Sequence, residues 1–150
     1  MNFSRFAALF TAAILLFSSP AFANSTSYED ALKSSSELYE QGRFQEAIPY
    51  AKRALAIAEQ EIGTDDAVFA ELLDNLAALY EAEMNYTRAQ PLYRRALDIR
   101  VKVYGAKHPE VIKSLINLAL IYDALGEYDA AVKMDARAIE IIEAGTLQGA

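Results

Sequence analysis

The sequence predicts an all-α fold of three stacked pairs of antiparallel helices, and two observations lead to this prediction. The first is an internal repeat: the pentads RALAI at 53–57, RALDI at 95–99 and RAIEI at 137–141 recur at a spacing of 42 residues. The second is that apolar residues within each copy recur at intervals of three and four, the period of an amphipathic helix. One helix pair cannot bury its apolar face alone, so neighbouring copies are expected to stack.

The segment 1–23 is set apart from the repeats. Arg5 is followed by an apolar run over 6–17 and by Ala21-Phe22-Ala23, the pattern of a secretory signal peptide with its cleavage site. The apolar run is shorter than the ~20 residues that comfortably cross a bilayer, although an uncleaved anchor stays open as an alternative. We therefore expect an exported protein, periplasmic in preference to another secreted setting, whose mature chain begins at Asn24.

Charge and composition exclude several classes of function. The 150-residue chain carries 14 Lys and Arg against 21 Asp and Glu, and its net charge of −7 argues against a nucleic-acid partner. It contains no cysteine, which excludes disulfides, thiolate metal sites and a cysteine nucleophile. After the signal segment the sequence contains no other long apolar stretch. We therefore expect no stable membrane insertion once that segment is removed.

Catalytic chemistry also lacks its usual residues. His108 is the only histidine, so no second histidine or cysteine can complete a metal-ligand set, and beside Pro109 it is expected to cap a helix. No glycine-rich phosphate loop is present either. We therefore expect no enzyme, no cofactor and no metal.

The repeat domain is expected over 24–145, with a short tail at 146–150. Its copies cover about 28–63, 66–105 and 108–143, and each consists of a helix, a tight turn and a second helix. Ser27 begins the first copy with an N-cap signal. The turn inside each copy needs a left-handed residue, supplied by Gly42 and Gly126, and in the middle copy Asn85 must take that part.

The middle copy shows the helical periodicity most clearly. The first stripe consists of Leu72, Leu73, Leu76, Leu79 and Tyr80, and the second of Tyr86, Ala89, Tyr93, Ala96, Leu97 and Val101. Gly63 and Gly105 mark the junctions between copies, because glycine is favoured just past a helix C-terminus. Pro49 and Pro91 occupy the same register in two of the second helices, and their role stays open.

The motif pattern resembles the tetratricopeptide repeat. The third copy contains Gly-x-Tyr-x-x-Ala over 126–131, and the second contains Ala-Gln-Pro-Leu-Tyr-Arg-Arg-Ala-Leu over 89–97. With the 42-residue period and Gly-Ala-Lys-His-Pro-Glu-Val over 105–111, these segments are similar to repeats of kinesin light chain type. The resemblance covers about 28–143 and implies a right-handed α-solenoid. Its first helices line a concave groove that binds an extended peptide or a helix.

The resemblance also implies which residues line that groove. They are Tyr39 with its neighbour Ser36 in the first copy; Glu71, Asp74, Asn75, Ala78 and Glu81 in the second; and Lys113, Ile116, Asn117, Leu120 and Asp123 in the third. An amide both donates and accepts, so Asn75 and Asn117 suit the backbone of an extended ligand. Acidic side chains outnumber basic ones here, which favours a basic or mixed apolar–basic protein segment as the ligand.

The main alternative is a structural module that associates with itself. The last helix carries more apolar residues than one covered face requires, namely Val132, Met134, Ile139, Ile141 and Ile142. Two such ends could pack together as a symmetric homodimer. The sequence thus leaves two hypotheses open, a peptide-binding groove and a dimerising end, and it names no partner.

Overall fold

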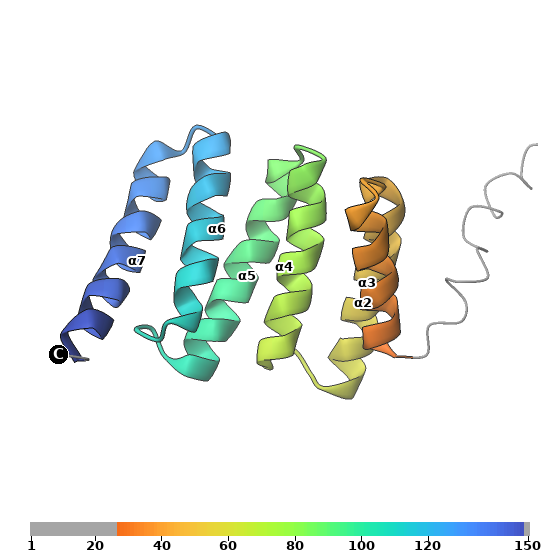
Figure 1. Ribbon diagram of the computed structural model, residues 1–150, viewed down its shortest axis with the longest axis horizontal. Coiled ribbons are helices and arrows are strands. Elements are labelled where there is room, and N and C mark those ends of the chain that lie inside the picture. Colours follow the sequence, from red (N-terminus) through yellow and green to blue (C-terminus); the bar gives the residue numbers. More distant parts are fainter. Residues whose placement is uncertain (1–26, 149–150) are drawn as a thin grey trace, which may run out of the picture.

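The computed structural model describes residues 27–148, and this range contains six α-helices and no strand. They are α2 (Tyr28–Glu40), α3 (Phe44–Glu61), α4 (Ala67–Ala82), α5 (Tyr86–Tyr104), α6 (Glu110–Ala124) and α7 (Tyr128–Gln148). Each helix packs against the next one in the chain, so the pairs α2–α3, α4–α5 and α6–α7 form three units in a row (Figure 1). The predicted all-α solenoid of antiparallel helix pairs is confirmed. The predicted signal peptide, 1–23, lies outside the described residues.

The last helix is longer than the sequence predicts. The helix α7 continues through Gly145 to Gln148, where a short tail is expected. One glycine inside a helix costs about 1 kcal/mol relative to alanine, which is too little to end a helix of this length. Pro49 and Pro91 likewise lie inside α3 and α5 without ending either helix.

A left-handed residue closes the turn inside each unit. Gly42 and Gly126 have φ angles of 71° and 76°, and Met84 takes a φ of 55° at the equivalent place in the middle unit. Asn85, expected in that role, has a φ of −91° instead. Its N–H donates back to the carbonyl of Tyr80 at 2.7 Å. This hydrogen bond fixes the register of the turn, so the residue before Asn85 must be left-handed whatever its type.

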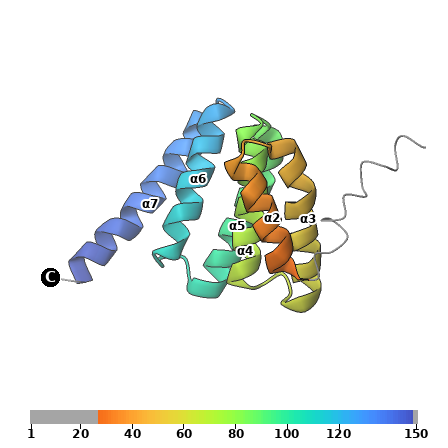
Figure 2. The same cartoon turned by 45° about the vertical axis from the view of Figure 1, so that its right-hand side comes forward.

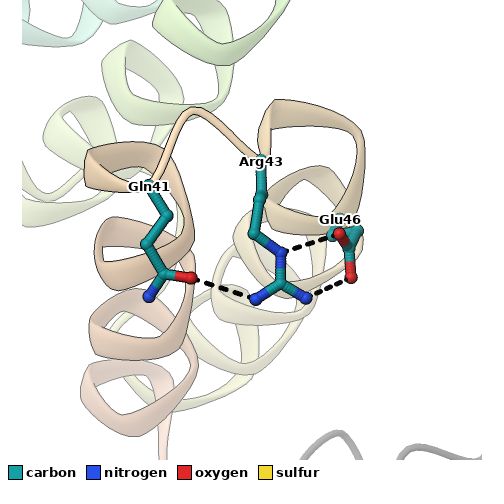
Figure 3. A network of polar contacts seen from close by, with 3 residues as sticks. All are labelled: Gln41, Arg43 and Glu46. Carbon is teal, nitrogen blue, oxygen red and sulfur yellow. Dashed lines mark hydrogen bonds and ion pairs between the residues drawn. The ribbon is translucent and has the colours of Figure 1, made fainter.

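A guanidinium group organises the turn between α2 and α3. The Nε and Nη2 atoms of Arg43 donate to the two carboxylate oxygens of Glu46 at 2.8 and 2.6 Å, and Nη1 donates to Gln41 Oε1 at 3.0 Å (Figure 3). These hydrogen bonds lower the pKa of the Glu46 carboxyl group. Both side chains are exposed, so the pair contributes little to stability and mainly orients the start of α3.

Side chains cap the starts of three helices. Ser27 Oγ accepts from the Asp30 N–H at 3.2 Å, and Asp66 Oδ1 accepts from the Val68 N–H at 2.8 Å. His108 Nδ1 accepts from the N–H of Glu110 at 3.2 Å, which confirms the predicted capping role of the histidine. Each bond satisfies a backbone donor that has no partner within its own helix.

The buried core consists of two clusters that differ in character, and the partly buried Leu55 and Leu92 pack against both. Around α3 and the first half of α4 it contains small residues, because Ala54, Ala58 and Ala70 are fully buried there. Farther along, larger residues such as Leu115 and Leu118 fill the space between units. Within residues 27–148, no helix combines the length and the apolar character that crossing a membrane requires.

Candidate functional site

The predicted groove residues lie on the first helix of each unit. Tyr39 is on α2; Glu71, Asp74, Asn75 and Glu81 are on α4; Lys113, Ile116, Asn117, Leu120 and Asp123 are on α6. Because Asn117 follows Asn75 by one 42-residue period, the two amides occupy equivalent places in neighbouring units. The same holds for Leu120 and Ala78. Exposed side chains at these positions therefore form one face that runs from unit to unit.

The structure brings four of the predicted groove residues, Ser36, Tyr39, Asn75 and Ala78, together in a cavity between α2 and α4. The cavity has a volume of about 290 Å³ and is lined by Ser35, Ser36, Tyr39, Glu40, Asn75, Ala78 and Leu79. The ring of Tyr39 packs against that of Phe44 with centroids 5.2 Å apart, which holds the phenol at the cavity edge. Asn75 is exposed on the other side. A polypeptide lying here would meet an aromatic ring and an amide from two different units.

The α6 part of the same face is more apolar. Ile116 and Leu120 are 45% and 57% exposed, and they lie one helical turn apart. Lys113 and Asp123 are exposed near the two ends of this patch, and Asn117 is half-buried beside it. Large aliphatic side chains exposed between polar ones are a common feature of surfaces that bind another protein.

The structure places Asp74 differently from the groove expectation. Its side chain is buried, and its Oδ2 accepts from Arg100 Nη2 of α5 at 2.7 Å. The Nη1 atom of Arg100 donates to Ser114 Oγ of α6 at 2.6 Å. This buried network joins three helices across the boundary between the second and third units. Asp74 therefore offers no free carboxylate to a ligand in the groove.

Burial also shifts the pKa of the carboxyl group in this network. Desolvation raises the pKa of the Asp74 carboxyl group, and this effect outweighs the opposing influence of Arg100 and the more distant Lys113. The second carboxylate oxygen, Oδ1, is buried without a hydrogen-bond partner in the described part of the chain. A buried carboxylate with only one of its two oxygens satisfied is an expensive group to keep ionised.

Glu81 is also less available than the sequence predicts. It is half-buried, and its Oε2 accepts from the hydroxyl of Tyr93 at 2.8 Å. Burial, followed by the bond to Glu81, raises the pKa of Tyr93 far above its usual range. Glu71 and Asp123 remain as exposed carboxylates on the groove face. The groove is therefore less acidic than a simple count of its carboxylates suggests.

Sequence reasoning missed five residues of this region. Ser35, Glu40 and Leu79 line the cavity, and Arg100 and Ser114 form the buried network. The repeat carries a signal for Arg100, since an arginine replaces the alanine found one period earlier at Ala58. No comparable signal marks the three cavity residues. Among residues 27–148, no group of three or more histidine, cysteine, aspartate and glutamate side chains could hold a metal ion.

Comparison with known proteins identifies the repeat. Residues 68–144 match one family model of the tetratricopeptide repeat, and residues 35–67 match a second family model of the same repeat. The chain belongs to the tetratricopeptide repeat family. Repeats of this family generally act as scaffolds for protein–protein contacts and carry out no chemistry of their own. No curated protein sequence gives a significant match.

Several solved structures share the fold. BtubC from P. vanneervenii superposes with a TM-score of 0.76 at 24% identity, covering 91% of this chain and 55% of that one. A kinesin light chain structure from Podosopora anserina with nearly identical TPR-like repeats gives 0.67 at 22% identity, covering 75% and 54%. The TPR domain of Arabidopsis FLU gives 0.66 at 19% identity, covering 78% and 95%. The chain thus spans little more than half of the first two proteins.

Proposed function

We propose that this tetratricopeptide protein is a non-catalytic binding module that holds a peptide segment of a partner protein in the groove formed by α2, α4 and α6. The observation that carries the proposal is the cavity where Tyr39 of the first unit meets Asn75 of the second. Asn117 repeats the amide one unit farther along. Two amides placed one repeat apart suit a ligand whose backbone is extended, because each can donate to a carbonyl and accept from an N–H.

The side chains around the amides define the chemistry of the ligand. Ile116 and Leu120 would cover an apolar side chain, and removing them from water favours binding. Glu71 and Asp123 are exposed on the same face and would attract a basic group. The ligand that fits best is therefore an extended segment with apolar residues in one half and lysine or arginine beside them.

Export is part of this proposal. It is supported by the charged start, apolar run and Ala-x-Ala site in 1–23. Sequencing the N-terminus of the protein recovered from a bacterial periplasm tests it. An N-terminus at Asn24 is expected, and recovery of the uncleaved chain from the membrane fraction would contradict it.

A second candidate function is self-association through α7. The observation in its favour is that Val132, Ile139 and Ile142 are exposed on this helix. Sedimentation equilibrium at several concentrations distinguishes the two candidates, because a groove-binding monomer keeps one mass and a dimer does not.

The decisive experiment removes the amides of the groove. The protein is crosslinked to its partners in the native compartment, and the wild type is compared with Asn75→Ala/Asn117→Ala. Each lost hydrogen bond costs about 1 kcal/mol, so the double variant should bind its partner roughly tenfold or more weakly.

A matched control keeps the test specific to the groove. Gln60→Ala/Asp98→Ala removes two exposed polar side chains from the second helices α3 and α5 and should leave the captured partner unchanged. Equal capture by wild type and the asparagine variant, or equal loss in both double variants, would overturn the proposal.

A further inference from the structure

The helices α3 and α5 each pack against the first helix of the next unit. The outward face of α7 is equivalent, by the 42-residue period, to the faces that make these contacts. Ile139 lies one period after Leu97, and Ile142 one period after Arg100. On α5 these positions are buried, and Arg100 bonds to Ser114 of the following helix, α6. On α7 they are 53% and 49% exposed. The stacking face is therefore present on α7, but no described residue covers it, and the helix lies at the end of the row (Figure 1).

The exposed residues form one continuous stripe. Tyr128, Val132, Ile139 and Ile142 are spaced by four, seven and three residues, so they fall on one side of the helix. Asp135 occupies the gap between Val132 and Ile139 and is exposed as well. We call these five residues the α7 stripe. Helix α7 diverges from α6 toward its C-terminus, and no further helix of the described chain lies beyond it (Figure 2).

At the other end of the described stack, α2 carries polar residues at the positions that α4 and α6 use for stacking. The helices α4 and α6 face the preceding unit with buried residues at three equivalent pairs of positions, namely Leu72 and Ser114, Leu76 and Leu118, Leu79 and Ile121. One period earlier, α2 carries Asp30, Ser34 and Glu37 at these positions. A second copy of the chain therefore cannot extend the stack by placing its α2 on the α7 stripe without burying two carboxylates.

The charge around the stripe decides which partner fits it. Asp135 lies within the stripe, Asp129 lies along one of its sides, and both are exposed. Two α7 stripes packed against each other would bring these carboxylates together, and like charges across an interface are unfavourable. A partner with lysine or arginine at those places would instead gain from them.

We propose that the α7 stripe binds one amphipathic helix of a partner protein, with an apolar stripe of its own flanked by basic residues. The bound helix takes the place that α6 takes on α5, so its apolar residues recur at intervals of three, four and seven. One basic residue pairs with Asp135. The equivalent face of α5 accommodates a buried charge, since Arg100 bonds to Ser114 of α6 and pairs with Asp74 of α4 at 2.7 Å. This site is separate from the groove and does not depend on it.

The test uses two synthetic helical peptides with the same leucine stripe, one flanked by lysines and the other by glutamates. Binding to the purified protein is measured by fluorescence anisotropy. The lysine peptide should bind saturably and at least tenfold more tightly than the glutamate peptide. Ile139→Ser/Ile142→Ser should weaken the lysine peptide at least tenfold. Asp135→Lys should reduce or reverse the preference between the two peptides, which loss of folding would not do.

A control variant separates loss at this site from a general loss of exposed apolar surface. Ile62→Ser/Val103→Ser removes two exposed aliphatic residues outside both α7 and the groove and should leave peptide binding unchanged. The inference is overturned if this control variant weakens binding as much as the α7 variant, or if neither peptide binds. It is also overturned if sedimentation shows a dimer that Ile139→Ser/Ile142→Ser dissociates, because the second copy is then the occupant.

Discussion

The two boundaries between units use the same backbone arrangement with opposite chemistry. Where α3 meets α4, Ala58 and Leu72 are buried in an apolar cluster. One period later, where α5 meets α6, Arg100 and Ser114 occupy these positions and are joined by a hydrogen bond. Asp74 completes that network from α4. A repeat therefore fixes the place of each side chain in the stack while leaving its chemistry free to vary.

The two boundaries should differ in how their stability depends on the exact positions of their atoms. Apolar contacts such as those of Ala58 are non-directional, and they stabilise in proportion to the area removed from water. The network of Arg100 with Asp74 and Ser114 depends on the angles and distances between its atoms. Replacing a buried ion pair by apolar residues is often neutral or stabilising, whereas removing one partner is costly. The second boundary should therefore be more sensitive to single changes than the first.

The largest effect is expected from Asp74→Leu. It leaves the guanidinium of Arg100 buried without its carboxylate, and breaking a buried pair in this way costs about 3–5 kcal/mol in the free energy of unfolding. Urea denaturation followed by circular dichroism measures it. Asp98→Leu removes an exposed carboxylate of the same unit and should change stability by less than about 0.5 kcal/mol. Similar losses in both variants would mean that the ionic boundary has no special sensitivity.

A smaller effect is expected from enlarging the apolar boundary. Ala58→Leu adds three carbons where alanine is fully buried, and overpacking of this kind costs about 1–3 kcal/mol. Ala56→Leu, at an exposed position of the same helix, serves as the control and should be close to neutral. If Ala58→Leu were also neutral, the close approach of α3 and α4 would not depend on small side chains.

The double variant Asp74→Leu/Arg100→Met sharpens the comparison further. It gives the second boundary an apolar character like that of the first, where the equivalent residues are Leu32 and Ala58. Its stability should return to within about 1 kcal/mol of the wild type or exceed it. Losses that add up from the two single variants would show that the residues do not act as a pair.

The smallest effect is expected from Asp74→Asn, which keeps an acceptor for Arg100 but cannot ionise. Burial raises the pKa of the Asp74 carboxyl group above its ordinary value, so the native protein holds this proton to higher pH than the unfolded chain does. Stability from this group is complete below about pH 4, near the usual pKa of an aspartate in an unfolded chain, and falls as pH rises through the folded pKa. The wild type should therefore lose this increment as the pH rises above about 4, and Asp74→Asn should not. Identical pH profiles would contradict the raised pKa.

The fold could be predicted from the sequence because the same pattern of apolar and turn residues recurs in three copies. The 42-residue period, the apolar spacing and the turn glycines all indicate the same helix pairs, and Gly42 and Gly126 take the expected left-handed conformation. Met84 shows the limit of this reasoning. The preference of asparagine for the left-handed conformation favoured Asn85, but the register of the hydrogen bonds places Met84 in that conformation.

The candidate site was predicted less completely, for a physical reason. Spacing along a helix assigns a residue to a face, but it does not show whether a neighbouring helix covers that face. Asn75 and Tyr39 are exposed and line one cavity, whereas Asp74, one residue before Asn75, is covered by α5 and α6. The partner that buries Asp74 is Arg100, distant in sequence, and no local pattern reveals such a pairing.

The most direct test of the account is hydrogen–deuterium exchange of the protein alone and in complex with the partner captured by crosslinking. If the groove holds the partner, exchange should slow on binding in peptides that cover α2, α4 and α6, centred on Tyr39, Asn75 and Asn117. Protection confined to the second helices α3 and α5, or to α7, would contradict the assignment of the binding groove.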